Sequence, residues 1–195
     1  MKANVLSLRP TQFAIGMLEV EIKSSQIQKL KGSRLANFLE AHPVPVIRAP
    51  GEGLYLIDHH HLVRACWESG IRKVHVEVRE DFSTLLEAQF WRKMSRLRWL
   101  YLHDQFGKGP HGPALLPLDV RGLADDPYRS LAWALREAQG FRKTKKPFCE
   151  FSWASFLRKH IRIHPARIGF EKALVHALAL CHKAEAKRLP GYSED

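Results

Sequence analysis

Four consecutive ionisable residues, Asp-His-His-His at 58–61, are the best candidates for chemistry in this 195-residue sequence. The apolar run at 54–57 predicts a strand before them, and the pattern that follows predicts a helix beginning near His60. The first amide groups of a helix lack partners within it, and the helix dipole adds positive charge there. Such a position commonly binds phosphate. The neighbouring carboxylate and imidazoles could transfer protons, contact phosphate oxygens or bind a metal ion.

Each of these residues has more than one predicted role. Asp58 is a candidate general base and Mg²⁺ ligand, and a helix cap is the structural alternative. Adjacent helical residues point about 100° apart, so at most two of the three histidines can reach one ion. His60 and Arg64 share a helix face and are predicted to hold phosphate. We therefore assign catalysis to Asp58, His60 and His61, and phosphate binding to His59, His60 and Arg64.

A second set of charged residues lies in the C-terminal half of the sequence. Asp125 and Asp126 precede a predicted helix, and capping explains Asp126 but not Asp125 or Arg129. Arg129 is therefore a candidate phosphate ligand, supported by Asp125 and Asp126. Glu150 and Arg158 lie on a predicted helix rich in aromatic residues, where they form either an ion pair or a further supporting part of the site.

The elements that must position these groups begin at residues 18–22, where apolar and acidic residues alternate as in a half-buried strand. Glu19 and Glu21 would then lie on the same side of the pleat. Exposure to solvent is the default for both. If this side faces the histidines, one of them, which we take to be Glu21, is a candidate general base.

The remaining pattern predicts an α+β fold, with a small mixed sheet and flanking helices followed by an all-helical part. Predicted strands are 44–47, 54–57 and 74–78, and predicted helices are 25–41, 60–69, 81–96, 128–139, 150–162 and 167–187. Residues 99–123 are rich in Gly and Pro and predict an irregular connection, in which His103, Asp104 and His111 could complete a metal site. We place a first domain at 1–105 and a helical extension, packed on it, at 106–195.

The composition indicates a globular protein with a basic surface. Hydrophobic residues make up 45% of the sequence, which is enough for a core and argues against intrinsic disorder. The net charge is +11, with a local maximum at Arg142, Lys143, Lys145 and Lys146, which either attracts phosphates or is a solvated surface. Because no membrane span, secretory signal or paired cysteine motif is present, we expect a cytoplasmic protein that does not bind membranes.

These features together resemble the ParB-like/sulfiredoxin superfamily and, within it, the ParB-like nuclease branch. The resemblance rests on Pro-Val-Pro-Val-Ile at 43–47, a glycine turn, and Leu-Tyr-Leu-Ile-Asp-His-His-His at 54–61. It covers roughly residues 6–80, and the segments at 125–132 and 150–158 extend it.

The superfamily motif at the helix start is Asp-Gly-His-x-Arg. Asp58 and His60 match this motif, whereas His59 stands at the glycine position and Leu62 at the arginine position. Glycine adopts unusual backbone conformations more readily than histidine does, and the missing arginine would have been a bidentate phosphate donor. Arg64 is the candidate substitute for that arginine.

The resemblance implies a nucleotide polyphosphate bound at this helix start, with Mg²⁺ and a nucleoside triphosphate or diphosphate as cofactors. Members include nucleotide-binding partition proteins, sulfiredoxin and ATP- or ADP-dependent serine kinases. Sulfiredoxin activity needs a cysteine in the motif, and here the nearest is Cys66, beyond it. We expect a phosphotransfer or phosphodiester-cleaving enzyme, either a nuclease or a nucleotide-dependent kinase. The alternative is a non-catalytic DNA-binding or nucleotide-switch protein in which residues 142–146 contact the DNA backbone.

Overall fold

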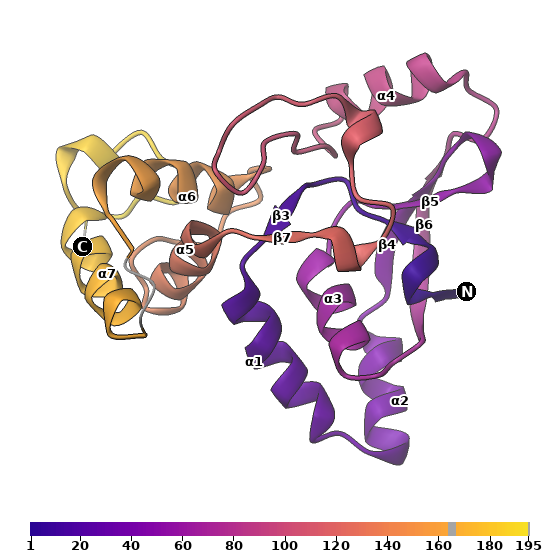
Figure 1. Cartoon of the computed structure of the whole chain (residues 1–195), viewed down its shortest axis with the longest axis horizontal. Helices are drawn as coiled ribbons and strands as arrows, with labels where there is room; N and C mark the ends of the chain where they lie inside the picture. Colours follow the sequence, from indigo (N-terminus) through magenta and orange to yellow (C-terminus); the bar gives the residue numbers. More distant parts are fainter. Residues whose placement is uncertain (164–166, 195) are drawn as a thin grey trace. The chain divides into compact units, whose positions relative to one another are not determined.

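A computed structural model describes residues 1–163 and 167–194 of the chain. The residues form two compact units, Met1–Asp125 and a second that begins at Asp126 (Figure 1). The first unit holds a mixed sheet with flanking helices, and the described residues of the second form helices and turns. The α+β class expected from the sequence is confirmed.

The boundary between the units lies later than the expected one at 105/106. Residues 120–125 belong to the first unit because Val120 and Leu123 are buried in its core. Strand β7 (Ala124–Asp125) also pairs in parallel with β3 (Ala14–Ile15), far away in sequence. The irregular connection therefore returns to the first unit before the helical part begins.

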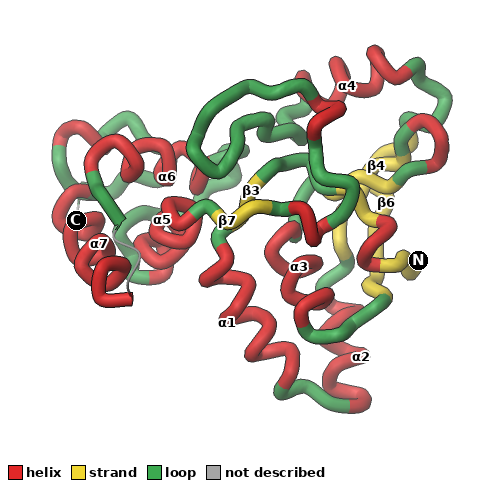
Figure 2. Tube along the Cα trace, in the orientation of Figure 1, coloured by secondary structure: helices red, strands yellow, loops and turns green. Residues whose placement is uncertain are grey.

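The main sheet has five strands in the order β1-β6-β4-β5-β2, seen in yellow in Figure 2. Their bounds are β1 Lys2–Asn4, β2 Leu8–Arg9, β4 Val44–Arg48, β5 Leu54–Leu56 and β6 Lys73–Asp81. Strand β4 runs parallel to β6 and antiparallel to β5, β1 is antiparallel to β6, and β2 is parallel to β5. The sheet is thus mixed, and the strands predicted at 44–47, 54–57 and 74–78 are confirmed.

Residues 18–22, predicted to be a strand, are helical. Helix α1 spans Met17–Gln28, and its residues Val20, Ser24 and Ile27 are buried. These positions follow the i, i+4, i+7 spacing of one helix face, so the short alternation of apolar and acidic residues was misleading. The next helix, α2, spans Gly32–Ala41. Gly32 has a φ of 53°, and the single helix predicted at 25–41 is therefore two.

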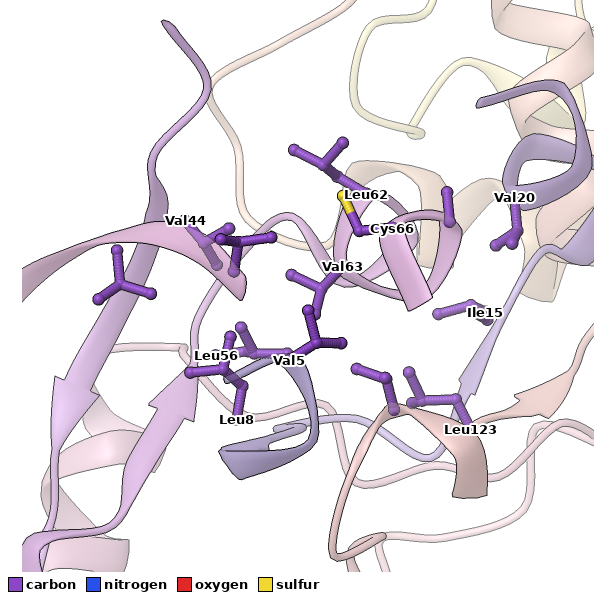
Figure 3. Close-up of a cluster of buried hydrophobic side chains, with 14 of the residues drawn as sticks. Val5, Leu8, Ile15, Val20, Val44, Leu56, Leu62, Val63, Cys66 and Leu123 are labelled. Carbon is purple, nitrogen blue, oxygen red and sulfur yellow. The ribbon is translucent and has the colours of Figure 1, made fainter. Parts of the chain in front are cut away.

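The two faces of the sheet are covered by different elements. Val44, Val46 and Leu56 belong to a core shared with α1, α2 and α3 (His60–Glu68), part of which is drawn in Figure 3. Successive strand residues point to opposite faces, and Tyr55 accordingly joins a second cluster with α4 (Glu87–Arg96). Helix α4 starts later than the predicted Asp81, because Asp81 ends β6 and Leu86 is the residue before the helix.

The second unit contains α5 (Pro127–Glu137), α6 (Cys149–His160) and α7 (Arg167–Leu180). All three helices were predicted, and α7 ends earlier than the predicted residue 187. The Phe141 and Trp153 rings stack in the core with centroids 4.4 Å apart, and Trp153 Nε1 donates to the Pro190 carbonyl at 2.8 Å. Within residues 1–163 and 167–194, none of the helices has both the length and the apolar character that crossing a membrane requires.

Candidate functional site

The start of α3 has the backbone geometry that an anion site needs. His59, the residue before the helix, adopts the left-handed conformation with φ 63° and ψ 23°, and it provides no side-chain cap. Glycine adopts this conformation without steric cost, which explains why glycine is usual at this motif position. Asp58 is exposed, and its Oδ1 accepts the His59 amide at 2.7 Å.

His60 points into the molecule. Its Nε2 accepts the backbone N–H of Thr11 at 3.2 Å and lies 3.3 Å from the Thr11 hydroxyl. That hydroxyl donates to the Leu56 carbonyl at 2.6 Å. Because only 6% of His60 is exposed, we interpret it as a residue that fixes the chain at Thr11 against the end of β5, and its predicted catalytic and phosphate-binding roles remain untested.

His61 joins the starts of α1 and α3. Its Nε2 accepts the Gly16 amide at 3.1 Å and lies 3.5 Å from Glu19 Oε2. Asp125 Oδ1 accepts the Met17 amide at 3.0 Å, so Asp125 caps α1 from a distant part of the sequence. The carboxylates of Glu19 and Asp125 both lie at the positive end of the α1 dipole, where negative charge is stabilised.

The carboxylate near His61 is Glu19, not the expected Glu21. The choice assumed a strand, on which both residues share a side. On the observed helix, residues two apart point about 200° apart, so Glu21 is exposed to solvent while Glu19 is largely buried. Thr11 and Gly16, which contact His60 and His61, had been given no role at the site from the sequence. The spacing of the apolar residues Val20 and Ile27 also fits a helix over residues 17–28. That interpretation would have placed Glu19 and Glu21 on different sides of the helix.

The guanidinium of Arg64 contacts other parts of the protein. Its Nη1 lies within hydrogen-bond distance of the Val120, Arg121 and Leu123 carbonyls, at 2.8, 3.2 and 3.4 Å. Its Nε donates to Glu68 at 2.8 Å. Arg64 therefore holds the segment at 120–123 against α3, and phosphate binding by this side chain would require those contacts to break.

The charged residues of the second unit form an ion-pair network. Glu150 forms ion pairs with two arginines: its Oε2 lies 3.0 Å from Nη1 of Arg129, and its Oε1 pairs with Arg136. Asp126 caps α5 by accepting the Tyr128 amide at 2.9 Å, and it pairs with Arg158 at 2.5 Å. The sequence had suggested a pair between Glu150 and Arg158, but each has a different partner.

Burial raises the pKa of the Asp126 carboxyl, and the attraction and hydrogen bond of Arg158 act in the opposite direction. Arg129 also stacks on Phe151, with its Cζ 4.1 Å from the ring centroid. Charges paired in this way contribute to the structure of the second unit, and the predicted phosphate-binding role of Arg129 remains a prediction.

No group of three or more His, Cys, Asp and Glu side chains in the described part of the chain is arranged to hold a metal ion. His111 and Asp104 do form a pair at 3.2 Å, but Asp104 also accepts the amides of Phe106 and Lys108 and so orders a loop. Mg²⁺ is often held by one or two carboxylates together with substrate phosphates. Asp58 is an exposed carboxylate at the start of α3 and fits this mode.

The three cysteines differ in burial. Cys66 is fully buried, and burial raises its thiol pKa from 9.0 to about 12. Cys181 is also fully buried, whereas Cys149 is partly exposed. We expect a thiol reagent such as DTNB to modify Cys149 alone in the native protein at pH 8, and all three cysteines after denaturation.

The same burial has a consequence at alkaline pH. Between pH 9 and 12 the folded chain keeps the Cys66 proton while the unfolded chain loses it, so stability should fall as pH rises through this range. The variant Cys66→Ala should lose less stability over this range than the parent chain. Rapid modification of Cys66 by DTNB in the native protein would show that its thiol is accessible, and Cys66 would then become a candidate catalytic residue.

The chain is similar to one protein family and to solved structures. A family described as "Putative ParB-like nuclease" matches residues 1–159. The crystal structure of protein Atu1540 from Agrobacterium tumefaciens is similar with a TM-score of 0.92 and 38% identity, over 99% of this chain and 95% of that chain. The C-terminally truncated chromosome-partitioning protein ParB from Caulobacter crescentus, complexed to the centromeric parS site, matches over 97% of this chain and 99% of that chain. Its TM-score is only 0.33, with 12% identity. No curated protein is significantly similar to the chain.

Proposed function

The chain belongs to the ParB-like nuclease family, and from this premise we propose that it binds phosphate groups of a nucleotide or nucleic acid at the start of α3. We further propose that it transfers or hydrolyses the bound phosphate. The observation that carries the proposal is the left-handed residue His59 before a helix without a side-chain cap, next to the exposed carboxylate of Asp58. Helix starts of this kind stabilise anions through amide groups and the helix dipole.

Within this proposal the side chains have separate tasks. Asp58 would hold Mg²⁺, which when bound neutralises charge on the phosphate oxygens. Because Nε2 of His60 and of His61 already accepts a backbone amide, both act as positioning residues that keep the start of α3 in place. Glu19 beside His61 supports this arrangement. Asp58 is therefore the residue on which we expect the chemistry to depend.

The proposal is tested by thermal shift with ATP, ADP, CTP, GTP and short oligonucleotides, each with and without Mg²⁺ or Mn²⁺. A ligand at about 100 times its dissociation constant stabilises by about 2.7 kcal/mol. For a chain of this size we expect the melting temperature to rise by roughly 5–10 °C. The same ligand should then be followed for turnover, as release of phosphate or cleavage of the oligonucleotide.

Two variants make this experiment specific. Asp58→Asn should abolish turnover and weaken the metal-dependent part of binding by at least about tenfold, the effect of losing one charged ligand contact. His59→Gly keeps the left-handed start of α3 available and should retain binding. If no nucleotide or oligonucleotide shifts the melting temperature with either metal, the proposal is wrong.

A second candidate function is a non-catalytic nucleic-acid-binding protein. The observation in its favour is the loop between α5 and α6, in which Lys143, Lys145 and Lys146 are all exposed. This function predicts DNA binding with a steep salt dependence and no turnover of any nucleotide or phosphodiester. A wild-type chain that hydrolyses its ligand, together with an inactive Asp58→Asn variant, would exclude it.

A further inference from the structure

Helix α4 of the first unit and the segment just after it carry exposed arginines that neither proposed function uses. The segment at 92–98 contains Arg92, Lys93, Arg96 and Arg98 and no acidic residue. Arg92, Arg96 and Arg98 are exposed, and in the described part of the chain none of the three takes part in an ion pair or a side-chain hydrogen bond. We call these three residues the α4 arginine face.

These three side chains take no part in the packing of α4 against the sheet. The residues that attach α4 to the sheet are Phe90 and Met94, both almost fully buried. Lys93 is held in place by the Phe82 ring, with Nζ 3.9 Å from the centroid. Arg92 and Arg96 are four residues apart on a helix, where like charges repel and lower helix stability. Packing therefore accounts for the buried side of α4, and Arg96 in the last turn also interacts favourably with the helix dipole. Neither effect accounts for Arg92 or Arg98.

Arg98 occupies a backbone position that favours glycine. Arg98 follows Leu97, the C-cap residue of α4, and has a φ of 57°. Its amide donates to the Ser95 carbonyl and the Trp99 amide donates to Met94, both at 3.0 Å, as in a glycine-terminated helix. An L-residue with a Cβ is strained in this conformation. An arginine here adds charge to the exposed face at the expense of local stability.

From these observations we propose that the α4 arginine face contacts the phosphate backbone of a nucleic acid. The planar guanidinium binds phosphate with two parallel hydrogen bonds. Arg92 and Arg96 are offset by about 6 Å along the helix, so they can contact separate phosphates on one strand. A net charge of +11 attracts a polyanion to the chain as a whole.

Two other anionic partners fit the surface less well. A helix that lies on a membrane inserts its apolar side into the lipid, but the apolar side of α4 is buried against the sheet. A protein partner usually provides aromatic or aliphatic anchors for a desolvated pocket. Between Arg92 and Arg96 the exposed position carries the small polar residue Ser95, and the apolar Leu97 that follows is only 38% exposed. A nucleic-acid backbone needs only charge and hydrogen bonds.

The test is fluorescence anisotropy of the full chain with a labelled mixed-sequence DNA, both duplex and single-stranded, from 50 to 200 mM salt. The double variant Arg92→Gln/Arg96→Gln should bind at least about tenfold more weakly, and the slope of log affinity against log salt should decrease by about 2. Arg98→Gly should also bind more weakly while its melting temperature rises. The matched control Lys29→Gln/Arg34→Gln removes the same charge from two exposed positions, one just after α1 and one in α2, and should change the slope little.

Specific results would overturn this inference. Wild-type affinity and slope in the Arg92→Gln/Arg96→Gln variant would show that nucleic acid binds elsewhere, and an equal loss in the control would show a general charge effect. Equally tight binding to polyglutamate or to phosphatidylserine vesicles would exclude nucleic acid as the specific partner. The inference does not depend on the α3 site, because the double variant should keep the nucleotide-induced thermal shift of the parent chain.

Discussion

Glu150→Ala is expected to lower the free energy of unfolding of the second unit by about 3–5 kcal/mol, the range found when one partner of a buried ion pair is removed. Glu150 Oε2 pairs with Arg129 and Oε1 with Arg136. Only 5% of Arg129 is exposed, so its guanidinium would lose its carboxylate without gaining water. The effect should therefore far exceed that of a surface ion pair.

Urea unfolding followed by hydrogen exchange of the α5 and α6 amides measures this effect in the unit where it occurs. Glu137→Ala is the matched control. Glu137 also pairs with Arg136, at 3.0 Å, but its side chain is 56% exposed, and the expected change is about 0–1 kcal/mol. Glu150→Gln keeps the shape and an acceptor and should fall between the two. A loss below about 1 kcal/mol for Glu150→Ala would show that the network adds little stability.

His60→Ala should destabilise the first unit by at least about 3 kcal/mol. Truncating a large buried side chain costs about 2–5 kcal/mol, and an unpaired buried amide adds about 1–3 kcal/mol. Here the amide is that of Thr11, whose N–H donates to His60 Nε2 at 3.2 Å. Any loss of activity in this variant would then follow from loss of structure, not from a missing catalytic group.

Two further variants distinguish a positioning role from a catalytic role for His60. His60→Gln offers an amide oxygen that can accept the Thr11 N–H, so it should recover a large part of the lost stability and of the ligand-binding signal. Asp58→Asn, at an exposed position, should leave the melting temperature of the free protein nearly unchanged. If His60→Ala is as stable as the parent chain and yet inactive, His60 acts directly on the substrate and our interpretation is wrong.

The local pattern of the sequence predicted much of the fold. Short stretches of neighbouring residues were enough to predict several elements: the strands at 44–47 and 54–57, the helix start near His60, and the start of α5 at Asp126-Pro127. Patterns of this length depend on backbone preference and on alternate or helical burial, which neighbouring residues determine. The glycine position of the motif also proved informative, since His59 has the left-handed conformation that glycine favours.

Prediction failed where a short pattern fits two structures. Residues 18–22 alternate as a strand does, yet the spacing of Val20 and Ile27 fits a helix equally well, and burial of this side decides the outcome. Because a strand was predicted at residues 18–22, Glu21 was chosen as the candidate carboxylate in place of Glu19. The domain boundary moved for a similar reason, because β7 pairs with β3 across about a hundred residues, a contact with no local signature.

The sequence by itself determined which residue types stand at the start of α3, how that helix begins, and that the chain is basic. Only the tertiary structure decided what those side chains contact. It directed His60 toward Thr11, His61 toward Gly16 and Glu19, and Arg64 toward the carbonyls at 120–123. The physical reason is that backbone conformation depends on neighbours in sequence, whereas a hydrogen-bond partner is selected by proximity in the folded chain, which sequence spacing does not specify.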